Sequence, residues 1–382
     1  MIEKTKILIN AFAARRGGGI TYIDNFLKHF PENENLSLTV LCGAYNEDIF
    51  RKSAAGKNNI AIKRVCGMKN VFIRGFYESF ILPFVLLLNH FQVYYAPSGL
   101  MTLLLPVPGV KKFTALRNML PFDDEQRKTF PWYNILRWKM LLLKYLFLLS
   151  YIFADGVIFI SEYSKSCVEK YLPNIGKKAV TIYHGLNVDF LNKTSDCDLL
   201  EKFNLKSGKY VLYVSILDYY KAQLPLMKDW VEIPKKICDY PLVLAGPCVN
   251  QYGQDVVNFA SNHSDRIKYI GPVEYKKLPQ LYQNAKALIF ASSCECCPNI
   301  LLEKMSAGVP VFSSDYQPMP EFGGEDVFYF NPYKTGNFKE IFCREMQKTD
   351  NMANAGKKVR QRAETIFSWD KTVRETLKFL TN

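Results

Sequence analysis

The chain lacks the features that mark a disordered, repetitive or fibrous protein. Its 382 residues contain 48% hydrophobic and 22% charged side chains, which is ordinary for a globular protein. No low-complexity tract is found, and no self-similarity recurs at the period of a solenoid. The length exceeds that of one typical domain and suits two domains of roughly 150–200 residues each.

A paired cysteine framework is also missing. The ten cysteines lie at irregular spacing, whereas a secreted chain is expected to carry a regular disulfide pattern. The apolar run near the start, Ile7–Ile9, is too short for the core of a signal peptide. We therefore expect a cytoplasmic protein with reduced thiols.

Acidic residues are fewer than basic ones, which gives a net charge of +13. Basic chains bind nucleic acid, anionic membrane surfaces or phosphorylated small molecules. No recognised DNA- or RNA-binding signature is present, so nucleic acid is not an expected partner. Cys294 and Cys297 form a C-x-x-C pair, but no second pair follows at zinc-site spacing. We accordingly expect neither a bound metal nor a redox function.

Strand-like and helix-like segments alternate through the first half. A short apolar strand leads into the basic, glycine-rich turn Arg15–Gly19, which precedes a helix and a second strand; this order opens a parallel sheet. Residues 71–91 are strongly apolar around Arg74 and Glu78, and a buried helix is expected there. The expected strands are 6–12, 36–43, 93–96, 112–116, 157–161 and 179–183, and the other expected helices are 20–30 and 162–171.

A polar stretch over residues 191–208 separates this series from a second one, and we expect the domain boundary there. The first domain is predicted over 1–190, with a C-terminal helix over 367–382 returning to it, and the second over 205–366. Two such series predict an α/β protein with two doubly wound, Rossmann-like domains and a ligand site in the cleft between them. In the second series the expected strands are 210–215, 242–245, 267–270, 287–290 and 309–313, and the expected helices are 224–231, 278–284, 299–307 and 367–380.

The segment 292–311 concentrates chemistry-bearing residues at a strand-to-helix turn. Pro298 suits the first turn of a helix, and Gly308 suits the position just past its end. Free N–H groups at a helix start can hold a phosphate or a sugar hydroxyl. Glu295 precedes the helix and Glu303 lies one turn or so inside it. Taken alone, the two glutamates also fit an ordinary loop acid and a solvent-facing helix residue, although the apolar neighbours of Glu303 argue against exposure.

This segment resembles the E-x7-E signature of the retaining, GT-B-fold glycosyltransferases of family 4. In that family the second half of the pattern reads roughly E-A-M-A-x-G-x-P-V, and here residues 303–311 read EKMSAGVPV. The likeness is strong over about 205–335 and weaker over the first domain. Its further parts are the strand and turn 242–247, the stretch 267–292 before the motif, and the F-S-W-D run at 367–370.

The resemblance implies a role for each matching residue of the second, donor-binding domain. Glu303 would hydrogen-bond the ribose of the donor nucleotide, and Glu295 would lie beside the transferred sugar. Backbone amides of three residues would meet the sugar and the diphosphate: Cys297, Asn299 and Ile300. Lys221 matches a lysine that neutralises the diphosphate leaving group. The usual Gly-Arg pair is replaced by Ser215-Ile216, so the arginine that accompanies this lysine is missing.

In the first, acceptor-binding domain the resemblance is limited to short turns. Gly18 and Gly19, within Gly17–Gly19, match the family's glycine-rich loop and become donor-binding candidates, since glycine lets the backbone approach an anion. Arg117 and Asn118 lie where many relatives carry a His-Asp pair near the acceptor and the sugar. The His184-Gly185 turn is expected to be structural. Lys221 and the glycines each also fit bland surface or turn roles when read without the motif.

The implied activity is that of a hexosyltransferase acting on a UDP- or GDP-sugar and on a glycan or lipid-linked acceptor, in the assembly of cell-surface polysaccharide or lipopolysaccharide. Retention of configuration is implied, and no metal or other cofactor is required when lysine and helix amides neutralise the phosphate. Two alternatives stay open. One is a non-catalytic protein of the same fold that binds a nucleotide sugar or a glycan. The other is a different enzyme on this scaffold, such as an epimerase or a phosphorylase.

A mixture of basic and aromatic residues over 111–144 suggests contact with a membrane. Interfacial helices carry such a mixture. The apolar run Leu141–Phe153 is interrupted by Lys144 and is too short to span a bilayer. We expect the chain to lie on the inner face of the membrane, held by anionic lipid; a core helix with a solvated basic face is the alternative. The basic residues are Lys111, Lys112, Arg117, Arg127, Lys128, Arg137, Lys139 and Lys144, and the aromatic ones are Phe130, Trp132, Tyr133, Trp138, Tyr145 and Phe147.

Overall fold

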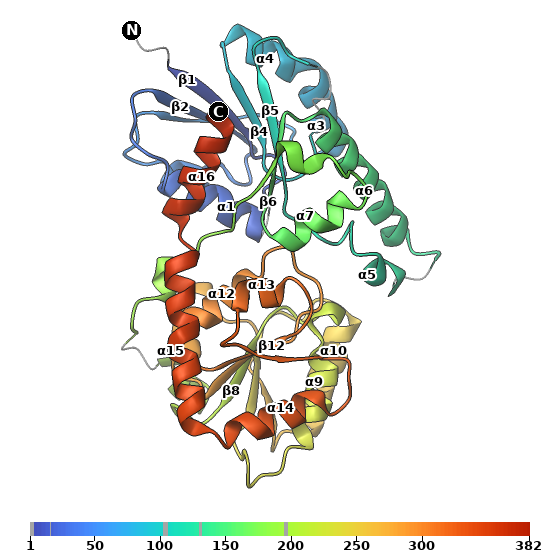
Figure 1. Cartoon of the computed structure of the whole chain (residues 1–382), viewed down its shortest axis with the longest axis vertical. Coiled ribbons are helices and arrows are strands. Elements are labelled where there is room, and N and C mark those ends of the chain that lie inside the picture. Colours follow the sequence, from blue (N-terminus) through green and yellow to red (C-terminus); the bar gives the residue numbers. More distant parts are fainter. Residues whose placement is uncertain (1–3, 16, 102–105, 130–131, 195–197) are drawn as a thin grey trace. The chain divides into compact units, whose positions relative to one another are not determined.

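The computed structural model describes residues 4–15, 17–101, 106–129, 132–194 and 198–382 (Figure 1). Arg16 of the expected basic turn and Phe130 of the expected membrane patch lie outside these residues. The chain forms two compact units. Unit 1 comprises Met1–Gly185 with Trp369–Asn382, and unit 2 comprises Leu186–Ser368.

The boundary lies earlier in the chain than the polar stretch 191–208, which belongs to unit 2. Leu186 donates a backbone hydrogen bond to Phe367 O at 3.0 Å, so the segment enters unit 2 beside the end of its last helix. Phe190 is then buried against the rings of Tyr275 and Tyr282. Leu186 and Phe190 therefore place the chain in unit 2 before the polar stretch begins.

Unit 1 is built on a seven-stranded, wholly parallel sheet of order β3-β2-β1-β4-β5-β6-β7. Its strands are β1 (Thr5–Asn10), β2 (Leu36–Cys42), β3 (Ile60–Arg64), β4 (Val93–Ala96), β5 (Lys111–Leu116), β6 (Gly156–Phe159) and β7 (Ala179–Thr181). Its helices are α1 (Gly18–Lys28), α2 (Glu47–Ser53), α3 (Val71–Phe76), η1 (Tyr77–Ile81), α4 (Leu82–Leu88), α5 (Asp124–Thr129), α6 (Ile135–Phe153), α7 (Glu162–Glu169), η2 (Ile175–Lys178) and α16 (Trp369–Thr381).

Right-handed crossovers decide which face of this sheet each helix covers. From β1 to β3 the chain moves outward in one direction, and from β3 onward it moves in the other. The helices α1 and α2 therefore lie on one face, where α16 joins them, and the segment 71–88 and α6 lie on the opposite face (Figure 1). The core on the first face includes Phe26 of α1 and Leu380 of α16.

The segment 71–88 is a helix, as expected, but it is not a buried one. Only 17% of it is buried, and Phe72, Phe84 and Leu88 are largely exposed. The expectation was wrong because an apolar composition does not reveal whether a helix faces the core or the surface. Its core-facing side includes Leu82 and Leu86, which are fully buried.

Unit 2 is a second parallel α/β unit with a six-stranded sheet of order β10-β9-β8-β11-β12-β13. Its strands are β8 (Val211–Val214), β9 (Leu242–Ala245), β10 (Ile267–Tyr269), β11 (Ala287–Phe290), β12 (Val311–Ser314) and β13 (Phe328–Phe330). Its helices are η3 (Val188–Phe190), α8 (Asp198–Lys202), η4 (Tyr219–Lys221), α9 (Gln223–Val231), α10 (Gln251–Asn262), η5 (Tyr275–Lys277), α11 (Leu278–Gln283), α12 (Asn299–Ser306), α13 (Met319–Gly323), α14 (Asn337–Met346) and α15 (Thr349–Ile366). The expected fold class, two doubly wound α/β domains, is confirmed.

Candidate functional site

Each sheet has one point at which the strand order reverses. In unit 1 this point lies between β1 and β4, and in unit 2 it lies between β8 and β11. Connections on the two sides of such a point leave in opposite directions and open a crevice at the carboxyl ends of the strands, where ligands of doubly wound folds bind. The residues after these four strands are therefore the places to look for a site.

In unit 2, Lys221 and Glu295 meet at the reversal point. Lys221 ends the short helix η4 after β8, and its backbone carbonyl accepts a hydrogen bond from the Tyr213 hydroxyl. Its ammonium group forms an ion pair with Glu295, which follows β11. Ser292 completes the group, because its hydroxyl donates to Glu295 Oε1 at 2.8 Å and lies 3.4 Å from Lys221 Nζ. Two loops that are 74 residues apart in sequence thus join in one polar cluster.

The Lys221 side chain is charged although Lys221 is only 4% exposed. Burial acts to lower its pKa, but the negative charge of Glu295 and the other neighbouring groups outweigh that effect, so the pKa of Lys221 is raised overall. The ammonium also lies 4.6 Å from the centre of the Tyr220 ring. A fixed cation at the carboxyl ends of the strands can stabilise negative charge that develops on a phosphate.

Glu303 lies on α12, directly after the same loop, and is only 7% exposed. One carboxylate oxygen accepts a hydrogen bond from the Tyr275 hydroxyl at 2.8 Å. Burial raises the pKa of Glu303 to about 7, and the Tyr275 hydrogen bond and the charge of Lys304 only partly oppose this rise. The solvent-facing interpretation of Glu303 is therefore wrong, because the structure places the carboxyl in a nearly dry environment with one polar partner.

The start of α12 presents its backbone differently from the expectation. The amide of Asn299 donates to Cys297 O at 2.9 Å, so this N–H is used inside the turn. The Asn299 side chain accepts from the Cys297 thiol at 3.4 Å. Pro298 has no N–H, and its carbonyl accepts from Leu301 and Leu302. Cys297 and Ile300 lie on either side of this closed turn, at the first turn of the helix.

A neutral network occupies the place of the missing arginine. The Ser215 hydroxyl donates to Ile216 O at 2.9 Å, and the Gln223 amide nitrogen donates to both Ser215 Oγ and Ile216 O at 2.9 Å. These bonds hold the loop after β8 in one conformation without adding charge. Lys221 is therefore the cation that this loop contributes to the cluster.

Sequence reasoning missed three residues that contact the predicted ones. Tyr275 bonds Glu303, and Ser292 bonds Glu295. Lys304 is wholly buried beneath the cluster, where its ammonium donates to Val214 O at 3.0 Å at the end of β8. Burial lowers the pKa of Lys304 well below the ordinary value. The sequence did contain a signal for Lys304, because the family pattern has alanine at this position. It contained none for Tyr275, because the contact of Tyr275 with α12 depends on the fold.

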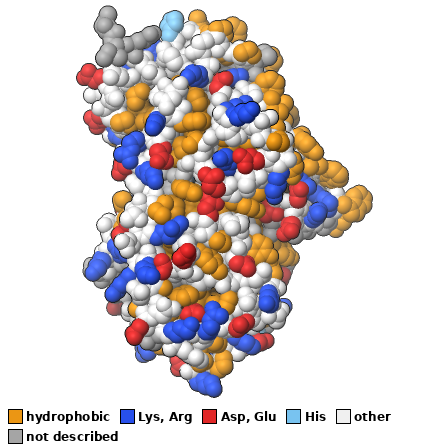
Figure 2. Space-filling model, viewed as in Figure 1, with side chains coloured by type: hydrophobic (Ala, Val, Ile, Leu, Met, Phe, Trp, Pro, Cys, Tyr) orange, Lys and Arg blue, Asp and Glu red, His pale blue; other side chains and the backbone are white. Residues whose placement is uncertain are grey.

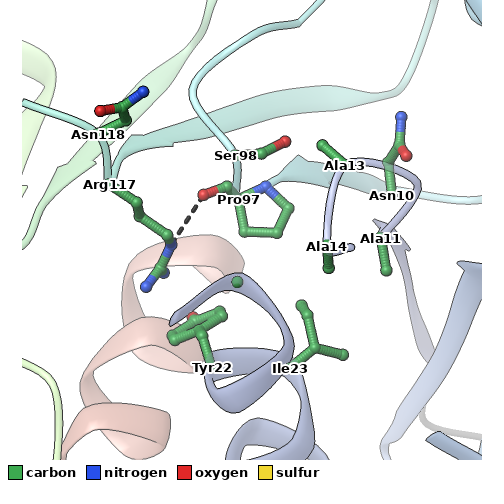
Figure 3. A pocket seen from close by; sticks show the side chains of 11 residues that line it. Asn10, Ala11, Ala13, Ala14, Tyr22, Ile23, Pro97, Ser98, Arg117 and Asn118 are labelled. Atoms are coloured by element: carbon green, nitrogen blue, oxygen red, sulfur yellow. Dashed lines mark hydrogen bonds between the residues drawn. The ribbon is translucent and has the colours of Figure 1, made fainter. Parts of the chain in front are cut away.

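In unit 1, a pocket of about 300 Å³ opens at the reversal point between β1 and β4 (Figure 3). Three of the predicted residues line it: Gly19, Arg117 and Asn118. Gly18 is the first residue of α1, and Gly17 before it has φ +58°. An added Cβ at Gly19 would lie 3.4 Å from the Ala14 backbone, in ordinary van der Waals contact with the loop after β1. The other lining residues are Asn10, Ala11, Ala13, Ala14, Tyr22, Ile23, Pro97 and Ser98.

Arg117 is held firmly in the wall of this pocket. Its guanidinium carbon lies 3.3 Å from the centre of the Tyr22 ring, and its Nε donates to Pro97 O at 2.8 Å (Figure 3). A further nitrogen bonds Nε2 of His184, whose ring packs against the rings of Tyr22 and Trp369. Because arginine only donates, Nε2 of His184 is the acceptor and the ring is neutral. This arrangement makes His184 a structural support for Arg117.

The expected basic patch over 111–144 is partly withdrawn from the surface. Lys112 is buried, and Lys144 is buried with its ammonium 2.6 Å from the Tyr171 hydroxyl and 3.2 Å from Asp124. Arg127 pairs with the same Asp124 at 3.0 Å, and Arg117 belongs to the pocket wall. Lys111, Lys128 and Lys139 are exposed and Arg137 is partly exposed, so only part of the expected basic patch is available for contact with a membrane.

Comparison with known proteins gives consistent results. Residues 198–362 match the model of the family described as glycosyl transferases group 1. O-antigen chain mannosyltransferase B from Escherichia coli is 24% identical over 238 residues, which is 59% of this chain and 60% of that protein. The chain thus spans less than two thirds of the length of this curated relative.

Two solved structures share the fold over almost the whole chain. A glycosyltransferase from Rickettsia africae has a TM-score of 0.75 at 16% identity, covering 99% of this chain and 98% of that one. HepE from Anabaena, solved in complex with UDP and glucose, has a TM-score of 0.74 at 15% identity, covering 99% of both chains. The fold is that of GT-B glycosyltransferases. Residues 198–362, in unit 2, thus match the glycosyl transferases group 1 family, over less than half of the chain.

Proposed function

We propose that the chain is a glycosyltransferase that moves a hexose from a nucleoside-diphosphate sugar to a glycan or lipid-linked acceptor. The observation that carries this proposal is the cluster of Lys221, Ser292 and Glu295 at the carboxyl ends of β8 and β11, with Glu303 on the helix that follows. A buried cation at the reversal point of a doubly wound sheet suits the diphosphate of a nucleotide.

In the proposed reaction, the bond between the anomeric carbon and the diphosphate oxygen breaks as the acceptor hydroxyl oxygen bonds to that carbon. The hydroxyl proton passes to the leaving group, which departs as the nucleoside diphosphate. Negative charge grows on the leaving phosphate, and Lys221 stabilises it. Glu295 orients Lys221 and lies beside the transferred sugar. Glu303 accepts a hydrogen bond from the ribose in place of Tyr275. Lysine and backbone amides neutralise the phosphate, so the mechanism requires no metal. Retention of configuration, by attack on the face that the leaving group departs from, is part of the proposal.

The substrates are proposed by class. HepE binds UDP and glucose and the Escherichia coli relative is a mannosyltransferase of O-antigen chains, so UDP- and GDP-sugars are the donors to test first. The same relative favours a role in the assembly of cell-surface polysaccharide or lipopolysaccharide. A lipid-linked acceptor would bring the reaction to the inner face of the membrane, where the chain would act as a peripheral protein.

The neutral Ser215–Gln223 network favours a second candidate function, a non-catalytic protein that binds a nucleotide sugar. One cation at the diphosphate can suffice for binding while giving slow transfer or none. Turnover of a bound donor, measured as released nucleoside diphosphate with and without glycan acceptors, separates the two. Binding without turnover under every condition would support this second candidate.

The test of the proposal is a calorimetric titration with UDP and with GDP at pH 8, where Glu303 is mostly ionised. Glu303→Gln keeps the shape of the side chain but removes a charge-assisted hydrogen bond of about 1.5–3 kcal/mol. Affinity for the nucleotide should fall about ten- to a hundred-fold. Glu340→Gln, at an exposed glutamate of α14, is the matched control and should bind like the wild type. Equal affinity of wild type and Glu303→Gln would contradict the ribose role.

A further inference from the structure

We propose that one face of unit 1 inserts apolar side chains into a lipid bilayer. This apolar face consists of the exposed side chains of residues 71–88 and 132–153. The proposal goes beyond sugar transfer, because it concerns how the chain is held at a membrane. It also differs from docking by basic residues. The bilayer contact proposed here is made mainly with hydrocarbon, and lipid charge adds to it.

The apolar face gathers most of the large hydrophobic side chains that unit 1 and unit 2 expose. Among the described residues, 26 large hydrophobic side chains are exposed; nine of them lie in 71–88 and ten in 132–153. Single exposed apolar residues are normal, but a contiguous apolar surface marks an interaction site. The members are Val71, Phe72, Ile73, Phe76, Phe80, Ile81, Phe84, Leu87, Leu88, Trp132, Tyr133, Ile135, Leu136, Trp138, Leu142, Tyr145, Leu149, Ile152 and Phe153.

The helix 71–88 has the reverse of the pattern expected on a water-facing surface, because its charged side chains are largely buried and its apolar side chains are exposed. Its acid, Glu78, is buried and accepts a hydrogen bond from Asn10 at 2.8 Å. Arg74 lies 3.7 Å from the same carboxylate, with a side chain that is only 14% exposed. Four phenylalanines at helical spacing point outward instead: Phe72, Phe76, Phe80 and Phe84. Their exposure is 87%, 59%, 62% and 65%, so this pattern puts charge inside and aromatic surface outside.

Helix α6 repeats the pattern. Its buried side carries Lys144 and Ser150, both hydrogen-bonded, whereas its exposed side is an apolar stripe at alternating spacings of three and four residues. Such spacing keeps the stripe on one side of a helix. The stripe is Ile135, Trp138, Leu142, Tyr145, Leu149 and Ile152.

The two helical segments cover the same face of the unit 1 sheet. Both follow strands that step in the same direction across the sheet, and right-handed crossovers then place them on one face. Figure 2 shows hydrophobic side chains gathered along the margin of unit 1 where Figure 1 draws α3, α4 and α6. The exposed apolar residues thus form one surface of the unit.

The charges around this surface match a bilayer. Glu78 is the only acidic residue in 71–88 and 132–153, and it is buried. Lys139 is exposed and Arg137 partly so, next to Trp138 on α6. Tryptophan and tyrosine beside basic residues suit the headgroup boundary, while phenylalanine and leucine suit the acyl region.

Insertion into one leaflet, and not a crossing of the membrane, follows from the topology. Val71–Leu88 is long and apolar enough for a span by length and composition alone. Its two ends, however, join β3 and β4, which belong to the same parallel sheet, and Leu82 and Leu86 are packed into the unit 1 core. The segment therefore lies along the sheet and meets the bilayer sideways.

The four tryptophans offer a direct readout. Trp132 and Trp138 lie on the apolar face, whereas Trp230 and Trp369 are buried in the cores. Full-length protein is mixed with phosphatidylcholine vesicles whose acyl chains carry bromine, a quencher that acts at short range. We expect fluorescence quenching on these neutral vesicles, persisting at high salt, and its loss in a Trp132→Phe, Trp138→Phe double variant that still floats with vesicles. Absence of quenching and of flotation on neutral vesicles would overturn the proposal.

Variants on the two helices test the face itself. Burying a phenylalanine is worth about 1.5–3 kcal/mol, so each of Phe72→Ser, Phe76→Ser, Phe80→Ser and Phe84→Ser should weaken vesicle binding about tenfold or more. Leu142→Ser with Leu149→Ser tests α6 separately. The matched control is Ile49→Ser with Val249→Ser, exposed apolar residues outside the face.

Two further measurements decide between occupants and separate this proposal from the proposed function. Calorimetric scans check that unit 1 of every variant still folds, and UDP and GDP titrations check that unit 2 still binds. Loss of vesicle binding with both results unchanged supports the proposal. Binding only to anionic vesicles and lost at high salt would mean electrostatic docking and would overturn it. A vesicle-independent dimer in light scattering, abolished by the four serine substitutions, would also overturn it.

Discussion

At the scale of single residues, the ionised form of Glu303 favours ligand binding but lowers the stability of the folded unit. A carboxyl buried beside one tyrosine hydroxyl is costly to ionise, and the rise of its pKa to about 7 expresses that cost. The ionised form is nevertheless the better acceptor for a ribose hydroxyl. We therefore expect that the carboxylate used for ligand binding lowers the free energy of unfolding of the folded unit.

The pH dependence of stability tests this conflict. Between about pH 4.5 and pH 7 folded Glu303 holds a proton that the unfolded chain releases, so its contribution to the free energy of unfolding falls as pH rises through that window. At pH 8 the cost reaches about 3 kcal/mol. Glu303→Gln should therefore unfold at a higher denaturant concentration than the wild type at pH 8, and with little difference at pH 4. If the free energies of unfolding of the two proteins change in parallel with pH, the raised pKa of the buried Glu303 carboxyl is contradicted.

Lys221 is the residue expected to act on the reaction rather than on binding. Charge on the leaving phosphate grows in the transition state, so Lys221→Ala should lower turnover by about 10²- to 10³-fold while nucleotide affinity changes less. Its ion pair with Glu295 complicates the single variant, because Glu295 loses its partner. Denaturation of Lys221→Ala and of a Lys221→Ala, Glu295→Ala double variant measures the stability cost of the unpaired carboxylate, and Lys228→Ala at an exposed position of α9 is the control. Turnover within about two-fold of wild type would assign the phosphate role elsewhere.

At the scale of elements, the site depends on how closely the ends of β8 and β9 approach. Gly246 follows β9 with φ +146°, and an added Cβ would lie 1.8 Å from Ser215 O at the end of β8. Ser215 in turn receives the Gln223 hydrogen bond that shapes the loop leading to Lys221. The absence of a side chain at one glycine therefore sets the geometry of the loop that carries Lys221.

Gly246→Ala is expected to destabilise unit 2 by more than backbone strain alone, because the methyl group collides with a backbone carbonyl. Gly208→Ala provides the control, since Gly208 also has positive φ but has nothing within 4 Å of the added Cβ. The control should cost about 1–2 kcal/mol, and Gly246→Ala clearly more, with weaker nucleotide binding. Chemical denaturation and calorimetry measure both effects. Equal costs for the two alanines would show that the contact with Ser215 is easily relieved.

Elements with a strong apolar signature were predictable. Strands 242–245 and 287–290 have the bounds expected, because each is a short apolar run that becomes fully buried. β3 was not predicted, since its sequence IAIKR mixes apolar and charged residues at a sheet edge. α15 was missed because the stripe that it buries is built from small residues such as Ala355 and Ala363, which give a weak apolar signal.

The residues of the site were predictable by type, but their contacts were not. The motif marked Glu295 and Glu303, and resemblance marked Lys221. That Lys221 pairs with Glu295 depends on β8 lying next to β11, a neighbour relation that five intervening helices and two strands conceal. The Tyr275–Glu303 bond depends likewise on the position of η5 beside α12.

At the scale of the whole molecule, the chain changes unit within two residues. Phe367 is buried in unit 2, with its ring stacked on Phe322 at 5.4 Å. Trp369 is buried in unit 1, where its ring stacks on His184 at 5.6 Å and where a Cβ on Gly185 would lie 2.2 Å from its backbone nitrogen. Two neighbouring aromatic residues therefore anchor the C-terminal crossing in separate cores.

Substitutions at these two positions should act on different units. A large aromatic residue replaced by alanine in a core costs about 3–5 kcal/mol. Trp369→Ala is expected to lower the thermal stability of unit 1 and to leave nucleotide binding intact, since Lys221 and Glu303 belong to unit 2. Phe367→Ala is the matched control and should lower the stability of unit 2. In calorimetric scans, UDP or GDP at about 100 times its dissociation constant should stabilise the unit 2 transition by about 2.7 kcal/mol. The nucleotide should raise the unfolding transition that Phe367→Ala lowers, and it should not change the transition that Trp369→Ala lowers. Two substitutions that lower one and the same transition would show that the units unfold together.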